Sequence, residues 1–468
     1  CPVGALTSKP YVFEARPWEL KKTESIDVMD AVGSNIRVDT YGWEVKRILP
    51  RINEDINEEW ISDKTRYACD GLKNQRLDTP FFRDGNKFNK ISWKEAYEIL
   101  KSKLENISSD KIGCFIGDLT NMETTYAAKE LFNKIFKSNL IESRSDNYYV
   151  NFSEKQNYIF NSNISGIEDS DLILMIGCNP RIEATILNSR IRKSYLKSKL
   201  QIYSTNDIGD QTYPYKILKN STNLIKDIIE GKNELTEKVV KSLKPMIIIG
   251  QSVLKLKSGQ YIFEELKNFL NKNNKITNEW NSLNILSNDA STVGSYDLTI
   301  FSSNNGRNIL LEKLKENSID LLFLLGQDKL NIERNGAFVV YIGSHGDQGA
   351  KNSDLILPGS AFTEQDGHYA NLEGKVQKAF KASYPTELAK EDWLILNEIS
   401  NVLRNKNLFR DKDDLIDNMF NYLNKEKKEE FIKTDYNFEN EKILVDYIDY
   451  YFSNVIAKNS ETMSECRS

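Results

Sequence analysis

Short apolar runs that end in glycine recur along this chain, and segments with apolar residues at helical spacing follow several of them. The runs occupy 111–117, 171–177, 245–250, 320–326 and 338–343. Nearly continuous apolar runs of this length are typical of strands that are covered on both faces of a parallel sheet. The alternation predicts an α/β fold with mostly parallel, doubly wound sheets. We expect two wound halves, with a break near residues 235–244.

The run 171–176 leads into a clear turn and helix start. Gly177 frees the backbone to turn, Asn179 is a good N-cap, and Pro180 suits the first helical position. A helix is therefore predicted from Pro180, with its charged residues nearer solvent; these are Arg181, Glu183, Arg190 and Arg192. A ligand site at this strand end is one interpretation. The single glycine favours a purely structural turn over a nucleotide site.

The net charge, the lengths of the apolar runs and the cysteine count argue against several classes of function. The 468 residues carry a net charge of -5, with 63 basic and 68 acidic residues, which argues against a nucleic-acid-binding surface. No apolar run approaches the roughly 18 residues that cross a bilayer, so direct membrane insertion is not expected. The five scattered cysteines favour a reducing compartment. Since residue 1 is a cysteine inside a motif, we expect that the natural N-terminus lies upstream.

Cys1 and the segment after it bear on iron-sulfur chemistry. In ferredoxins, a Cys-Pro pair closes the run of cysteines that bind an iron-sulfur cluster. For Cys1 alone, an ordinary turn cysteine is the simpler interpretation. Alternating apolar and polar residues at 26–32 and 35–41, with a turn at Gly33, predict a small antiparallel β unit. Cys69 is the only cysteine there. A tetranuclear cluster needs about four thiolates, so this unit cannot hold one by itself.

Polar residues near the Gly343 loop are weaker candidates for a site. The only histidines, His345 and His368, lack companions at metal-ligand spacing, so hydrogen bonding is favoured over metal binding. Three nearby carboxylates could include an acid/base pair. Charged loop residues are mostly solvated, however, so the simpler interpretation is that all three face solvent. Those carboxylates are Glu364, Asp366 and Glu373.

Nine segments closely resemble the large iron-sulfur subunit of respiratory complex I. They are 1–10, 23–39, 47–54, 58–66, 70–73, 171–192, 343–347, 354–359 and 371–374. The resemblance extends from Cys1 to about Arg404 and implies four parts. These are the end of a ferredoxin-like domain (1–17), a β-rich subdomain with a degenerate cluster site (18–80), a molybdopterin-oxidoreductase-like α/β domain (81–404) and a charged helical tail (405–468).

The resemblance also implies cofactors. Cys1 would be the last ligand of a 4Fe-4S cluster whose other three cysteines lie upstream. A 2Fe-2S cluster and a second 4Fe-4S cluster would lie in the same upstream region. This branch of the superfamily is not known to use molybdenum, so none is expected. Cys114 and Cys178, at strand ends, are expected to be inert packing residues.

The implied function is electron transfer from NADH via iron-sulfur clusters toward quinone, without an independent active site in this chain. Other peripheral-arm subunits of complex I would be the partners. The protein would lie peripherally on the inner membrane, on the cytoplasmic side in a bacterium or the matrix side in a mitochondrion. Two alternatives stay open at this point: a molybdopterin-dependent oxidoreductase, and a non-catalytic scaffold.

Overall fold

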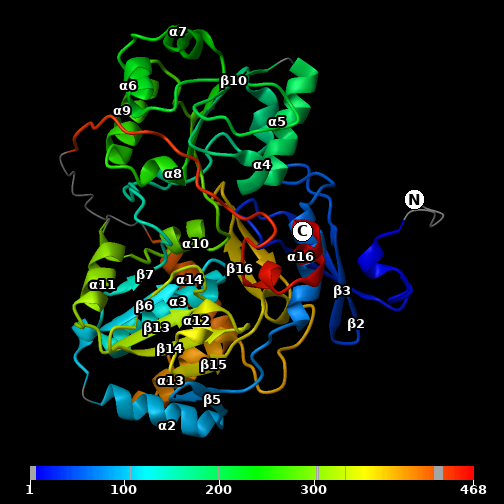
Figure 1. Cartoon of the computed structure of the whole chain (residues 1–468), viewed down its shortest axis with the longest axis vertical. Coiled ribbons are helices and arrows are strands. Elements are labelled where there is room, and N and C mark those ends of the chain that lie inside the picture. Colours follow the sequence, from blue (N-terminus) through cyan, green and yellow to red (C-terminus); the bar gives the residue numbers. More distant parts are fainter. Residues whose placement is uncertain are drawn as a thin grey trace.

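The computed structural model describes residues 7–105, 107–198, 200–301, 303, 305–332, 334–425 and 436–468. Cys1 lies outside these residues. Two mostly parallel sheets form separate units along the longest axis of the molecule, and a small antiparallel sheet lies beside them (Figure 1). The predicted α/β class is confirmed.

The small sheet contains β1 (Lys21–Ile26), β2 (Asn35–Tyr41) and β3 (Glu44–Pro50), paired antiparallel in that order. The antiparallel unit was predicted correctly, but its first strand ends at Ile26 instead of beginning there. The Asp27 and Asp30 carboxylates accept the backbone N–H groups of residues 29 and 32, both at 3.1 Å. Such local bonds favour turns over a strand.

The larger parallel sheet has seven strands in the order β5-β4-β15-β14-β13-β6-β7. They are β4 (Phe81–Asp84), β5 (Lys87–Lys90), β6 (Ile112–Ile116), β7 (Ile141–Glu142), β13 (Leu321–Leu325), β14 (Phe338–Gly343) and β15 (Leu355–Pro358). Strand β4 pairs antiparallel with both β15 and β5, and the other neighbouring strands of this sheet are parallel. Every residue of β6 and β13 is buried, as the continuous apolar runs predict. Helices α2 (Trp93–Leu104), α3 (Met122–Glu130) and α13 (Asp392–Arg404) pack together in this unit.

The second parallel sheet has five strands in the order β10-β9-β8-β11-β12. They are β8 (Leu172–Ile176), β9 (Gln201–Ser204), β10 (Lys216–Ile217), β11 (Pro245–Gly250) and β12 (Leu283–Leu286). This sheet is inserted between β7 and β13 of the larger one, so the predicted break near residues 235–244 is wrong. Leu321 of β13 pairs with Ile112 of β6, more than 200 residues earlier. Local patterns carry no information about such a distant pairing.

The helix predicted from Pro180 begins there but is interrupted. Helix α4 (Pro180–Glu183) ends at Glu183. The next residue, Ala184, has the non-helical angles φ -149° and ψ 73°, and α5 (Thr185–Ser198) follows it. The expectation that the charged residues face solvent is wrong for Glu183, which is 5% exposed, and Arg190, which is 2% exposed. Arg190 donates to the Ile56 carbonyl oxygen and pairs with Glu168, so it attaches this helix to the small β unit.

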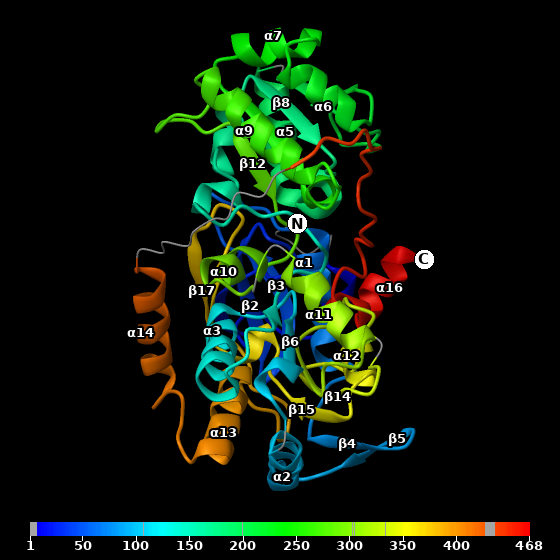
Figure 2. The same cartoon turned by 90° about the vertical axis from the view of Figure 1, so that its left-hand side faces the viewer.

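The C-terminal segment connects all three units. Helix α14 (Lys412–Leu423) packs against α3, and residues 436–454 run from the five-stranded unit toward the small sheet (Figure 2). Thr222 donates its backbone N–H to the carbonyl oxygen of Glu441 at 2.9 Å. Helices α15 (Val455–Lys458) and α16 (Glu461–Arg467) then pack on the 3-10 helix η2 (Ala68–Lys73). None of the described helices has the length and apolar character of a membrane span.

Candidate cofactor site

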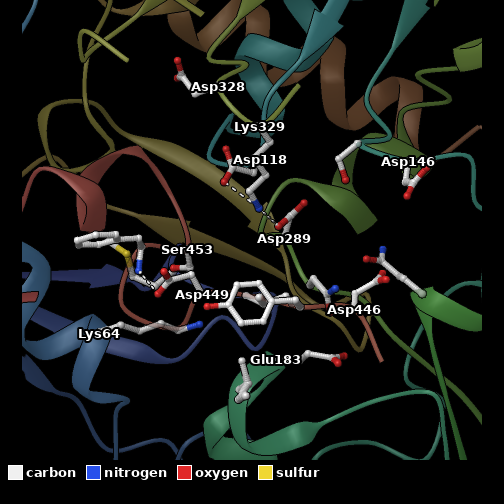
Figure 3. Close-up of a pocket in the computed structure, with 18 of the residues that line it drawn as sticks. Lys64, Asp118, Asp146, Glu183, Asp289, Asp328, Lys329, Asp446, Asp449 and Ser453 are labelled. Atoms are coloured by element: carbon white, nitrogen blue, oxygen red, sulfur yellow. Dashed lines mark hydrogen bonds and ion pairs between the residues drawn. The ribbon is translucent and has the colours of Figure 1, made fainter. Parts of the chain in front are cut away.

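A cavity of about 460 Å³ lies where the carboxyl ends of strands from both parallel sheets meet. Asp118 follows β6, Asp328 and Lys329 follow β13, Gln251 follows β11, and Asn288 follows β12. Doubly wound folds bind ligands beyond the carboxyl ends of their strands, so this cavity is the natural place for one. Residues 446–453 of the C-terminal segment form part of its wall (Figure 3).

The cavity is lined by more carboxylates than cations. The carboxylates are Asp118, Asp146, Glu183, Asp289, Asp328, Asp446 and Asp449. The cations are Lys64, Lys255, Lys329 and Lys458. The excess of acidic groups makes the lining unfavourable for an anion.

Each lining lysine already has acidic partners. Lys329 lies between Asp118 and Asp289, with its Nζ 3.1 Å and 2.5 Å from their carboxylate oxygens (Figure 3). Burial lowers the pKa of Lys329, but the two carboxylates outweigh it and hold that pKa above its ordinary value. Lys255 contacts Asp146 and Asp446.

The other two lysines pair with acidic residues outside the lining. Lys64 lies 3.3 Å from Asp30, and Lys458 lies 2.9 Å from Asp347. The cavity therefore offers a phosphate group no cation that lacks a carboxylate partner, within the residues described.

The molybdopterin dinucleotide expected of active superfamily enzymes does not fit this cavity. A pyrophosphate needs cations or a glycine-rich set of backbone N–H groups, whereas this lining is acidic. The metal would need a thiolate, selenolate or hydroxyl ligand. No cysteine is among the described lining residues, but Ser145 and Ser453 carry hydroxyls, so the misfit rests on the acidic lining and not on the metal ligand.

Two lining carboxyls have strongly shifted pKa values. Burial raises the pKa of Glu183 to about 7, although its Oε1 accepts the Asn179 N–H at 2.9 Å. Burial likewise raises the pKa of Asp328 to about 7, although it accepts hydrogen bonds from the Tyr341 hydroxyl and the Gly349 N–H. The sequence analysis missed both groups as site residues. The only sequence signal for Asp328 as a site residue was its position, as a charged residue just after the apolar run of β13.

The cysteines are dispersed through the described fold. Cys114 lies inside β6, and Cys178 follows β8 and donates to the Ile248 carbonyl oxygen at 3.8 Å. Burial raises the pKa of both thiols well above the ordinary value. Cys69 is half-buried, and burial followed by the charge of Asp70 raises its pKa to about 12. These thiols are protonated at neutral pH, as packing residues would be.

The turn at Gly177 has a structural role. Its φ is +59°, and a Cβ there would lie 2.4 Å from Val253 Cγ2 and 2.6 Å from Ser252 Oγ. Side chains of α8 (Gln251–Leu254) therefore occupy the space that a phosphate would need. This packing supports the structural interpretation of the turn over a nucleotide site.

Both histidines form hydrogen bonds, as favoured from the sequence. His345 Nε2 donates to the Gly71 carbonyl oxygen at 3.0 Å, and His368 Nδ1 lies 2.5 Å from Glu123 Oε1. Among the residues the structure describes, no group of three or more His, Cys, Asp or Glu side chains is arranged to hold a metal ion.

The three loop carboxylates do not form an acid/base pair. Glu364 binds Arg76, Asp366 accepts the backbone N–H of residue 381, and Glu373 accepts that of residue 164. Because each carboxylate has a separate partner, no acid/base pair forms among them, and the expectation of a solvated side chain is wrong for Glu364, which is 4% exposed.

Two family models match the chain. Residues 76–402 match "Molybdopterin oxidoreductase", and residues 20–70 match "NADH-ubiquinone oxidoreductase NDSU1/NuoG-like, 4Fe-4S domain". The second match contains the small antiparallel sheet and Cys69.

Three relatives align over the whole of this chain. The NADH-ubiquinone oxidoreductase 75 kDa subunit of Reclinomonas americana is 41% identical, and the chain covers 71% of it. The mitochondrial 78 kDa subunit of Candida albicans is 41% identical with 67% covered. An NADH-quinone oxidoreductase subunit of the bacterium Rickettsia bellii is 39% identical with 68% covered. The chain therefore belongs to the family of the large iron-sulfur subunit of respiratory complex I, within the molybdopterin oxidoreductase superfamily.

Proposed function

We propose that this chain serves electron transfer from NADH via iron-sulfur clusters toward quinone, as a subunit of complex I. The observation that carries the proposal is the 41% identity along the whole chain with the 75 kDa subunit of Reclinomonas americana. The chain's own contribution is to supply one cluster ligand and to dock against other peripheral-arm subunits. It has no independent active site.

Cys1 is the proposed ligand of a 4Fe-4S cluster. The proposal rests on the resemblance of residues 1–10 to the family's ligand motif. The other three thiolates are proposed to come from outside these 468 residues, as the resemblance implies. Cys114 and Cys178 are buried in the fold and are proposed to take no part. A 2Fe-2S cluster and a second 4Fe-4S cluster belong to the same outside segment.

The ligand assignment is tested by Cys1→Ala in the intact subunit within assembled complex I. Loss of one tetranuclear cluster from the electron paramagnetic resonance spectrum is expected, together with a lower NADH-to-quinone flux. Cys466→Ala is the matched control, because it makes the same chemical change at an exposed cysteine. Unchanged cluster spectra and flux in Cys1→Ala would remove the ligand assignment.

The α/β domain is proposed to have a structural role and to bind no molybdenum. The acidic lining of the cavity between the two parallel sheets supports this, since it opposes the pyrophosphate of the dinucleotide. Elemental analysis of the natively purified complex tests it. Iron without molybdenum is expected, and molybdenum in stoichiometric amount would favour the molybdopterin-dependent oxidoreductase instead.

The division of the chain into four parts, with boundaries at 17/18, 80/81 and 404/405, remains a prediction.

The protein is proposed to lie peripherally on the inner membrane, on the cytoplasmic or the matrix side. Release of the complex's peripheral arm by chaotropic salt, with this chain in the released fraction, is the expected result. Retention of the chain in the membrane fraction after release of the arm would contradict the placement.

A further inference from the structure

Two amide side chains in the lining of the cavity between the two parallel sheets have no side-chain hydrogen-bond partner among the described residues. Gln251 is 5% exposed, lines the cavity, and makes no side-chain hydrogen bond with any described residue. Asn288 also lines the cavity, and its buried Oδ1 is without a partner among the described atoms. A buried amide without a partner is unfavourable by about 1–3 kcal/mol. Asn288 Oδ1 is closed off from solvent, whereas the Gln251 amide still reaches the cavity, so Gln251 is the amide that a ligand could satisfy.

The two amides lie at neighbouring strand ends. Gln251 directly follows β11 and Asn288 follows β12 by two residues. These strands are parallel partners, and Gly250 pairs with Leu286 in their register. The amides are therefore presented together at the carboxyl edge of the five-stranded sheet.

Two buried carboxyls at the same cavity lack a cationic partner among the described residues. Glu183 comes from the five-stranded unit and uses Oε1 to accept one backbone N–H. Asp328 comes from the seven-stranded unit and accepts only from the Tyr341 hydroxyl and the Gly349 N–H. Figure 3 shows these carboxyls on opposite sides of the group formed by Lys329, Asp118 and Asp289. Negative charge is thus offered from both units.

We propose that this cavity binds a small organic polycation, an aliphatic diamine or polyamine. Its ammonium groups donate to Glu183, Asp328 and the amide oxygen of Gln251. Its methylene segments contact the apolar parts of the lining, which include Met29 and Phe452. The ligand contacts both sheets, and the C-terminal segment forms part of the wall around it.

The chemistry of the lining favours this ligand over two others. A phosphate-bearing ligand would face the acidic excess without an unpaired lysine in the described lining. A metal ion would need converging ligands, and the described residues contain no group of three suitable side chains close enough to hold one. A polyamine distributes its charge along a chain and so matches carboxyls that lie apart.

Isothermal titration calorimetry of the full 468-residue chain with spermidine at pH 8 tests the proposal. This pH lies above the pKa of about 7 of Glu183 and Asp328, so both carboxyls are mostly ionised. One spermidine per chain is expected to bind, and inorganic pyrophosphate is expected not to bind. Absence of spermidine binding, or preferential binding of pyrophosphate, would overturn the proposal.

Glu183→Gln removes one charge at nearly constant size. It is expected to weaken spermidine binding about tenfold, through the loss of one charge-assisted hydrogen bond. The matched control is Glu234→Gln, the same chemical change at an exposed glutamate of α7 (Glu234–Lys241) in the same unit. Equal affinity of the two variants would contradict the assignment of Glu183.

Gln251→Leu separates binding from folding. Because the amide has no described partner, its replacement is expected to keep or raise the melting temperature of the free protein. It is also expected to reduce the upward shift of that temperature by spermidine. A lower melting temperature together with an undiminished spermidine shift would show that Gln251 serves the fold and not a ligand.

Discussion

The guanidinium of Arg76 forms two parallel hydrogen bonds with the carboxylate of Glu364, with Nη1–Oε1 and Nη2–Oε2 distances of 2.5 and 2.6 Å. The two side chains are only 7% and 5% exposed. Arg76 also donates to the carbonyl oxygens of Leu72 and Ser344. One buried ion pair therefore joins the end of the small β unit to two loops of the seven-stranded unit.

Breaking this pair from one side is expected to destabilise the chain strongly. Glu364→Leu leaves a buried guanidinium without its counter-ion, which lowers the free energy of unfolding by about 3–5 kcal/mol. The double variant Arg76→Met/Glu364→Leu is expected to be more stable than Glu364→Leu alone. Urea unfolding followed by circular dichroism measures both. Glu237→Gln, in an exposed pair with Lys241, is the control and is expected to leave the midpoint unchanged.

His345 is expected to make stability depend on pH. Burial, with Arg76 close by, lowers the pKa of this histidine to about 3, while an unfolded chain has a histidine pKa of about 6.5. Between these values the unfolded state binds the extra proton, so His345 stabilises the fold above about pH 6.5 and this contribution is lost as the pH falls.

The His345→Gln variant isolates this effect. Between pH 6.5 and 4.5 the wild type is expected to lose up to about 1.4 kcal/mol per pH unit more than the variant. Unfolding free energies from urea titrations at several pH values measure the difference. Parallel pH dependences of the two proteins would contradict the neutral, buried state of His345.

The thiols are expected to react in the order of their exposure. Cys466 is exposed and should be alkylated by iodoacetamide in the native protein, whereas Cys114 and Cys178 should react only after unfolding. Peptide mass spectrometry after brief labelling at pH 8 gives the order. Rapid native labelling of Cys178 would mean that its turn opens far more readily than its burial implies.

Gly117→Ala is expected to disturb the strand ends that place Asp118 and Asp328 in the lining of the cavity. A Cβ at Gly117 would lie 1.7 Å from the carbonyl oxygen of Gly326, and only a backbone shift can relieve this contact. We expect a loss of about 3 kcal/mol or more in unfolding free energy, together with weaker spermidine binding, because these glycines precede Asp118 and Asp328. Gly166→Ala is the control, since its nearest neighbour is a Trp280 ring atom at 3.4 Å. Equal stability of the two variants would contradict the close strand approach.

The candidate site shows how far local patterns extend. The sequence favoured a structural turn at Gly177 and an inert packing role for Cys178, and the surroundings of both residues support that interpretation. Gln251 and Asn288 carry no distinguishing pattern. Their significance comes from the absence of a described partner at a common cavity, which depends on neighbours that are distant in the sequence.

The sequence by itself determined the α/β class, the fully buried strands and the family, because apolar periodicity and motif residues are local properties of the chain. Only the tertiary structure decided that the five-stranded sheet is inserted into the seven-stranded one and that Asp27 and Asp30 form turns. It also decided that residues as far apart in the chain as Val28 and Lys458 line one cavity. The physical reason is that one apolar strand can form the same backbone hydrogen bonds with any of several similar strands. The choice among them is made by the packing of the whole core.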